Sequence, residues 1–84
     1  MKTLRDLQPL MNALAAFECA GRHGSFTTAA KELGTSQPAV SRHIANLEDH
    51  LNSALFERHH NRIELTPAGQ RFYDAVNLGL SHIQ

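Results

Sequence analysis

The stretch SFTTAAKELGTSQPAVSRHIANLEDHL, residues 25–51, decides how this chain folds. Its pattern predicts a short helix, a tight turn closed by Gly34, and a longer helix that opens at Pro38, because proline suits the first turn of a helix. The longer helix has one apolar face, with residues four, three and four apart: Val40, Ile44, Leu47 and Leu51. Two helices joined in this way are typical of a helix-turn-helix, whose second helix enters the major groove of DNA.

The opposite face of the longer helix is small and uncharged in its N-terminal half, except for Arg42. Acidic side chains, Glu48 and Asp49, come only in its later turns. A helix that is merely solvated usually carries charged residues along its whole length. A helix that lies against base edges needs small residues and a few hydrogen-bonding groups. The N-terminal half of this helix is therefore predicted to read DNA, and its C-terminal half to point away.

Helical spacing also extends to the chain before this stretch. Residues 1–8 are predicted to form a loose arm, and a helix is predicted from Pro9 to a glycine stop at Gly24. Cys19 lies on this helix and is interpreted as a small packing residue, because nothing nearby in the sequence would activate its thiol. The apolar positions expected in this helix and in the short helix after it are Leu10, Leu14, Phe17 and Gly21, then Phe26, Ala30 and Leu33.

Period-two alternation after the longer helix predicts a β-hairpin. The runs 54–57 and 63–66 are interpreted as two short strands of a half-buried sheet. The basic residues expected at the tip between them are Arg58, His59, His60 and Arg62, and of these Arg58, His59 and Arg62 are expected to bind DNA. A hairpin beside a helix-turn-helix is a wing, and this one would place the most basic part of the chain next to the longer helix.

A final helix is predicted from the capping pair Thr66–Pro67 onward. Its narrow apolar stripe is interpreted as a dimer seam rather than a core face, and consists of Phe72, Val76, Leu80 and Ile83. The expected fold is therefore mainly α. Residues 1–65 would form a winged helix-turn-helix of three helices and a two-stranded wing, and residues 66–84 a linker and dimerisation helix.

The composition limits the kinds of partner that this chain can bind. Eighty-four residues allow one small domain, and eight Lys and Arg balance eight Asp and Glu, so the formal net charge is zero. Phosphate neutralisation supplies much of the affinity of DNA-binding proteins, so the basic groups must be clustered and a single copy should bind weakly. One cysteine, no apolar run of about 18 residues and no signal peptide predict a cytoplasmic protein without a membrane partner.

A set of motifs resembles the N-terminal DNA-binding domain of LysR-type transcriptional regulators over about residues 10–76. The residues that carry the resemblance are Phe17, Gly24-Ser25-Phe26-Thr27, Ala29-Ala30, Leu33, Ser36-Gln37-Pro38-Ala39-Val40-Ser41-Arg42, Ile44, Leu47-Glu48, Leu55-Phe56, Arg58 and Leu65-Thr66-Pro67-Ala68-Gly69. One departure is Asn52, which stands where the family commonly has glycine, and asparagine tolerates the left-handed conformation required there.

The resemblance implies a role for each matching residue. Residues at the major groove would be Gln37, Pro38, Ser41 and Arg42, and residues at the DNA backbone would be Thr27, Thr28 and Ser36. Arg58 would support the wing at the minor groove. The resemblance also implies a homodimer through the linker helix, a tetramer in the full-length protein, and a C-terminal domain, absent here, that binds a small-molecule effector. No cofactor is expected in this fragment.

Three other interpretations are weaker. An enzyme is disfavoured because Ser41, His43 and Asp49 lie on one helix with diverging side chains. A metal site built on His59 and His60, with a histidine from the longer helix (His43 or His50), lacks thiolates and regular ligand spacing. A winged helix used only for protein–protein contact remains a rival, because zero net charge permits it.

Overall fold

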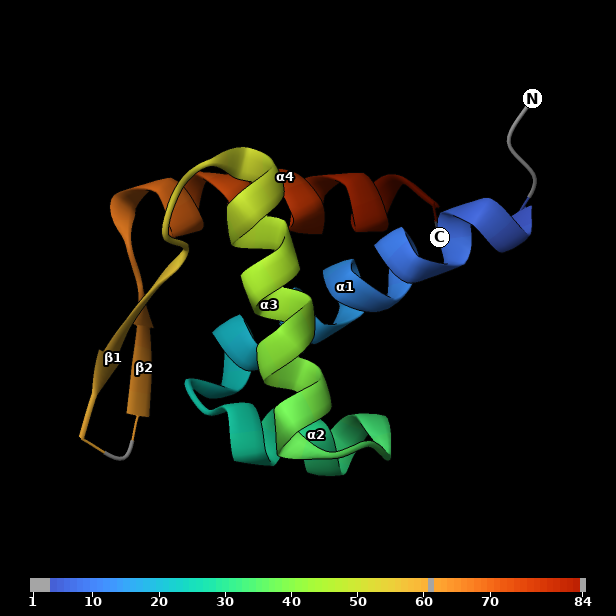
Figure 1. The fold of residues 1–84 in the computed structure, drawn as a ribbon. Helices are drawn as coiled ribbons and strands as arrows, with labels where there is room; N and C mark the ends of the chain where they lie inside the picture. Colours follow the sequence, from blue (N-terminus) through green and yellow to red (C-terminus); the bar gives the residue numbers. More distant parts are fainter. Residues whose placement is uncertain (1–3, 61, 84) are drawn as a thin grey trace.

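The structure is a computed structural model that describes the backbone of residues 4–60 and 62–83 and the side chains of residues 9–60 and 62–79. Four helices and one antiparallel hairpin follow one another along the chain: α1 (Leu4–His23), α2 (Phe26–Leu33), α3 (Gln37–Leu51), β1 (Phe56–His59), β2 (Arg62–Leu65) and α4 (Pro67–Ile83). The C-terminal end of β1, the N-terminal end of β2 and the N-terminal end of α3 lie at the same end of the molecule, and α4 lies at the opposite end (Figure 1). The predicted winged helix-turn-helix fold is confirmed.

Local capping residues set the bounds of α2 and α3. The Ser25 hydroxyl accepts a hydrogen bond from the Thr28 N–H (3.1 Å), and the Ser36 hydroxyl accepts one from the Ala39 N–H (3.2 Å). Gly34 ends α2 at φ +68°, and Asn52 ends α3 at φ +52°. The expectation that Asn52 takes the left-handed conformation in place of glycine is confirmed.

Phe17 of α1 is the centre of the core and is fully buried. Its ring lies 5.5 Å from that of Phe56 in β1, 5.0 Å from that of Phe72 and 6.0 Å from that of Tyr73 in α4. Aromatic pairs at these separations add stabilisation beyond the burial of their area. One side chain therefore ties α1 to the wing and to the first turns of α4.

The predicted apolar faces are right at their centres and wrong at their ends. Leu10, Leu33 and Leu51 were expected in the core, but 47%, 40% and 43% of their surfaces are exposed. Leu33 and Leu51 are the last residues of α2 and α3, and Leu10 lies in the second turn of α1, before the first described buried residue of that helix, Ala13. The part of α1 that packs inward is instead made mostly of small residues: Ala13, Ala16, Cys19 and Ala20. Small side chains let α2 and α3 approach α1 closely, as the adjacent alanines Ala29 and Ala30 also do.

The start of α1 also differs from the prediction. The helix begins at Leu4 and contains Pro9, so residues 4–8 are helical rather than part of a loose arm. Pro9 is the sixth residue of the helix and cannot donate the backbone hydrogen bond of an interior position, whereas the leucine, arginine and glutamine before it favour helix. The part of the predicted arm at residues 1–3 lies outside the described residues.

The strands of the wing lie closer to the turn than expected. The register pairs Phe56 with Leu65 and His59 with Arg62, so cross-strand pairing extends through residues that were expected in the tip. The predicted basic tip is therefore wrong in detail, because Arg58, His59 and Arg62 belong to the strands. Their side chains alternate between the two faces of the sheet, which separates Arg58 from the other two.

The near half of the α4 stripe packs on the core of its own chain. Phe72 contacts Phe17, and Val76 is half-buried against the same cluster. The side chains of Leu80 and Ile83 lie outside the described residues. The domain boundary at residue 65 and the dimer seam stay predictions. No helix in the described part of the chain is both long and apolar enough to cross a membrane.

Candidate nucleic-acid interface

The N-terminal half of α3 presents the surface that the sequence predicted. Gln37, Pro38 and Arg42 are exposed and Ser41 is half-buried, whereas Val40 on the other side of the helix is fully buried. Within the described residues, no carboxylate lies at ion-pairing distance from Arg42. Its guanidinium therefore keeps its charge and its donors for an external partner.

The first turn of α2 adds hydroxyl groups at the same end of the molecule. Thr27 and Thr28 are both exposed, and the backbone N–H of Thr28 is already used by the Ser25 cap. Ser36 likewise accepts from the Ala39 N–H, which leaves its own hydroxyl proton free to donate. These positions suit contacts to phosphate oxygens, which carry most hydrogen bonds between proteins and DNA.

The inner side of the wing and the start of α2 enclose a shallow open hollow. Arg58 lies over the ring of Phe26, with its guanidinium carbon 4.9 Å from the ring centroid. The residues that line the hollow are Ser25, Phe26, Thr27, Arg58, His59, Arg62 and Ile63, and none of them is acidic. The structure therefore brings Thr27, predicted at the DNA backbone, and Arg58, predicted in the wing at the minor groove, to one place with the chemistry that an anion requires.

The outer side of the wing is less basic than its sequence suggests. Glu57 and Glu64 face each other across the hairpin. Arg62 forms an ion pair with Glu64 at 3.1 Å, and the His59 ring nitrogen lies 3.7 Å from Glu64 and 3.8 Å from Glu57. These carboxylates offset part of the positive charge of the wing. Of the wing residues predicted to bind DNA, Arg58 alone has no carboxylate at ion-pairing distance within the described residues.

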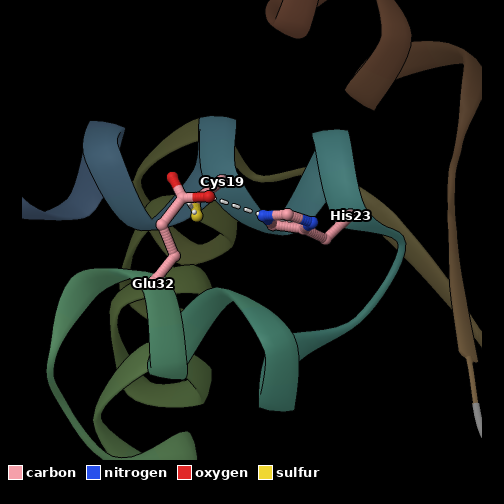
Figure 2. A group of neighbouring side chains, drawn as sticks. All are labelled: Cys19, His23 and Glu32. Atoms are coloured by element: carbon pink, nitrogen blue, oxygen red, sulfur yellow. Dashed lines mark hydrogen bonds and ion pairs between the residues drawn. The ribbon is translucent and has the colours of Figure 1, made fainter.

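The histidine metal site considered from the sequence is not formed among the described residues. His59 shares its possible ligand cluster with Glu57 and Glu64, and neither His43 nor His50 joins it among the described residues. A second cluster, absent from the sequence analysis, joins Cys19 and His23 of α1 to Glu32 of α2 (Figure 2). Both clusters have the donor types of a metal site, so their other neighbours decide how to interpret them.

Arg22 already supplies the cation that the second cluster needs. Its Nη2 lies 2.6 Å from Glu32 Oε2 and 3.8 Å from Cys19 Sγ, and the guanidinium also pairs with Glu18 at 2.9 Å. His23 Nε2 lies 2.7 Å from the other Glu32 oxygen. Burial, and then the hydrogen bond to Glu32, raises the pKa of the Cys19 thiol to about 11, so the thiol stays protonated. We interpret the cluster as an ion-pair clip between α1 and α2.

This clip predicts a stability difference that depends on pH. Hydrogen bonds from Arg22, and then from His23, lower the pKa of Glu32 from 4.5 to about 2. A carboxylate whose pKa is lower in the folded state stabilises the fold above its unfolded pKa and loses that effect as pH falls toward its folded pKa. Urea unfolding should show a higher free energy of unfolding for the wild-type protein than for Glu32→Gln at pH 6. This difference in free energy should decrease to zero between about pH 4.5 and pH 2. A difference that is constant with pH would contradict the clip.

Glu48 has a role that the sequence analysis missed. Its carboxylate accepts hydrogen bonds from the backbone N–H groups of Leu55 (2.8 Å) and Phe56 (3.4 Å). The sequence pattern predicts for Glu48 only a place in the half of α3 that points away from DNA. The sequence holds one sign of this role: Glu48 lies one turn before the end of α3 and only seven residues before Leu55. This contact attaches the start of the wing to the last turns of α3.

Comparison with known proteins places this geometry in a family. Residues 11–70 match the family model described as "Bacterial regulatory helix-turn-helix protein, lysR family". The glycine cleavage system transcriptional activator of Escherichia coli is 48% identical over 65 residues, which cover 77% of this chain and 21% of that protein. The probable RuBisCO transcriptional regulator of Cyanidioschyzon merolae is 46% identical over 70 residues, or 83% of this chain and 23% of that protein. The chain thus spans less than a quarter of the length of these relatives.

Solved structures agree with the sequence relatives. The chain in the "CbnR_DBD-DNA complex" has a TM-score of 0.81 and 36% identity, over 86% of this chain and 83% of that one. The chain in the "BenM_DBD/benA site 1 DNA Complex" has a TM-score of 0.82 and 37% identity, over 87% and 82%. Both of these solved structures are complexes with DNA.

Proposed function

This chain belongs to the lysR family of bacterial regulatory helix-turn-helix proteins, and we propose that it is the domain with which a transcription regulator binds a specific double-stranded DNA sequence. In this proposal α3 reads base edges in the major groove through Gln37, Pro38, Ser41 and Arg42. The wing contacts the DNA backbone beside it through Arg58. The protein would act in the cytoplasm and without a catalytic role.

One observation carries this proposal. The N-terminal half of α3 carries Arg42, which has no carboxylate at ion-pairing distance within the described residues. This half of α3 lies at the same end of the molecule as α2 (Figure 1). The start of α2 and the wing line the hollow that contains Thr27 and Arg58. Glutamine and arginine hydrogen-bond to adenine and guanine in the major groove, and the hollow offers a cation and a hydroxyl to a phosphate. The DNA complexes of the two similar solved chains support the same partner for this one.

We further propose that the domain works as a dimer. The formal net charge of zero makes a single copy a weak binder. Two copies joined through α4 would place two α3 helices on one duplex, and the second contact would then form at high effective concentration. Phe72 and Val76 already pack partly on their own core, so the seam would rest mainly on the far half of the stripe, Leu80 and Ile83. A small-molecule effector would bind a further domain, and assembly of the longer protein into tetramers belongs to the same proposal.

The experiment that tests the function is selection of bound fragments from random DNA, followed by titration of the selected site at several salt concentrations. We expect a palindromic site, as two symmetric copies require, and an affinity that falls steeply with added salt. Sedimentation of the free protein at high micromolar concentration should show a dimer. If no sequence is enriched and binding to DNA does not depend on salt, the winged helix serves protein contact instead.

A further inference from the structure

The partner of Arg58 is an aromatic ring and not an acid. Its guanidinium carbon lies 4.9 Å from the centroid of the Phe26 ring, at a separation typical of a cation–π contact. By contrast, Arg22 and Arg62 pack near carboxylates and form ion pairs with Glu32 at 2.6 Å and with Glu64 at 3.1 Å. A ring differs from a carboxylate because it attracts the cation without neutralising it. The N–H donors of a stacked guanidinium also point outward in its own plane, where a phosphate can reach them.

The Phe26 ring is itself held in place by the core. Only 6% of Phe26 is exposed, and the ring meets Phe56 edge to face, at 5.6 Å and 90°. Phe56 in turn lies 5.5 Å from the fully buried Phe17. This chain of aromatic contacts fixes the plane of the Phe26 ring. One face of the ring is therefore available to Arg58 at a set position beside Thr27, in the hollow between α2 and the wing.

We propose that Phe26 is a positioning residue for DNA binding, which holds the Arg58 guanidinium over the start of α2 so that the wing meets the DNA backbone with its cation already in place. This inference rests on the proposed function. An arginine side chain has many rotamers, and fixing it on contact with DNA would cost conformational entropy. The ring removes part of that cost before DNA arrives, and it links the wing to the helix-turn-helix at the point where both reach the duplex.

The test is to weaken the face of the ring while keeping its shape. Site-specific replacement of Phe26 by trifluorophenylalanine withdraws electron density from the ring but preserves its packing. We expect affinity for the selected DNA site to fall by about two- to fivefold per wing, because an exposed cation–π contact has about that strength. Partial fluorination should give intermediate affinities, and the midpoint of urea unfolding should stay near that of the wild type.

Two controls separate positioning from packing. The same fluorinated residue at Phe17, which packs in the core on Phe56, Phe72 and Tyr73, should leave DNA affinity unchanged. In an Arg58→Ala background, which should itself bind many sequences more weakly, fluorination of Phe26 should have no further effect. Fluorination that lowers affinity equally with and without Arg58, or that has no effect in the wild type, overturns the inference. A wild-type protein without salt-dependent DNA binding refutes the proposed function instead, and the two failures are therefore distinct.

Discussion

Gly69→Ala is expected to cost this domain about 3 kcal/mol or more of its free energy of unfolding. Gly69 lies buried in the first turn of α4, and a Cβ there would lie 2.0 Å from the backbone oxygen of Leu55. Forced overpacking usually costs about 1–3 kcal/mol, and a clash with backbone belongs at or beyond the upper end. A domain of this size has roughly 4–13 kcal/mol in total, so urea unfolding should show a much lower midpoint or no folded state.

The close approach at Gly69 cannot be relieved by a small shift. The Thr66 hydroxyl donates to the Ala54 carbonyl at 2.6 Å and accepts from the Gly69 N–H at 2.9 Å, and the Thr66 N–H donates to the Leu55 carbonyl at 3.0 Å. Moving α4 outward would break the bonds from Thr66 to the carbonyls of Ala54 and Leu55, which attach the helix to the chain before β1.

Gly79 provides the matched control on the same helix. It is exposed, and a Cβ there would meet nothing within 4 Å. Gly79→Ala should therefore raise stability by up to about 1 kcal/mol, the difference in helix propensity. If Gly69→Ala unfolds at the same urea concentration as Gly79→Ala, α4 does not pack this closely against the backbone of Leu55.

Arg42→Ala is expected to have the largest effect on recognition. Arg42 is exposed and unpaired within the described residues, so its removal should leave the urea midpoint nearly unchanged. A bidentate contact to guanine contributes roughly 1–3 kcal/mol of discrimination at each half-site. The ratio of affinities for the selected site and a shuffled site, measured by fluorescence anisotropy at fixed salt, should fall by at least tenfold for a dimer.

Arg71→Ala removes the same charge from an exposed position on α4. It should leave the ratio of affinities for the two sites unchanged, whatever it does to their absolute values. An unchanged ratio for Arg42→Ala as well would remove Arg42 from the proposed reading surface and leave Gln37 as its main side chain.

The features of the fold that depend on interactions between near neighbours in the chain were predicted well from the sequence. Ser25, Gly34, Ser36 and Asn52 act within a few residues of themselves, so their patterns locate the bounds of α2 and α3. Val40 and Ile44 repeat at helical spacing and are fully buried, so the exposed side of α3 opposite them, which we propose to face DNA, was also predictable. The errors at Leu10, Leu33 and Leu51 have the opposite cause, because periodicity gives the direction of a face and not how far the covering elements extend.

The sequence by itself thus determined the order of the elements, the winged helix-turn-helix and the bare half of α3, because capping, turn geometry and hydrophobic periodicity act within one or two turns of chain. Only the tertiary structure decided which charges are free. It pairs Arg62 with Glu64 and Arg22 with Glu32, places Arg58 on the ring of Phe26, and brings Gly69 against Leu55. Most of these contacts join different elements of the fold, so their distances depend on how the whole core packs, which local spacing does not encode.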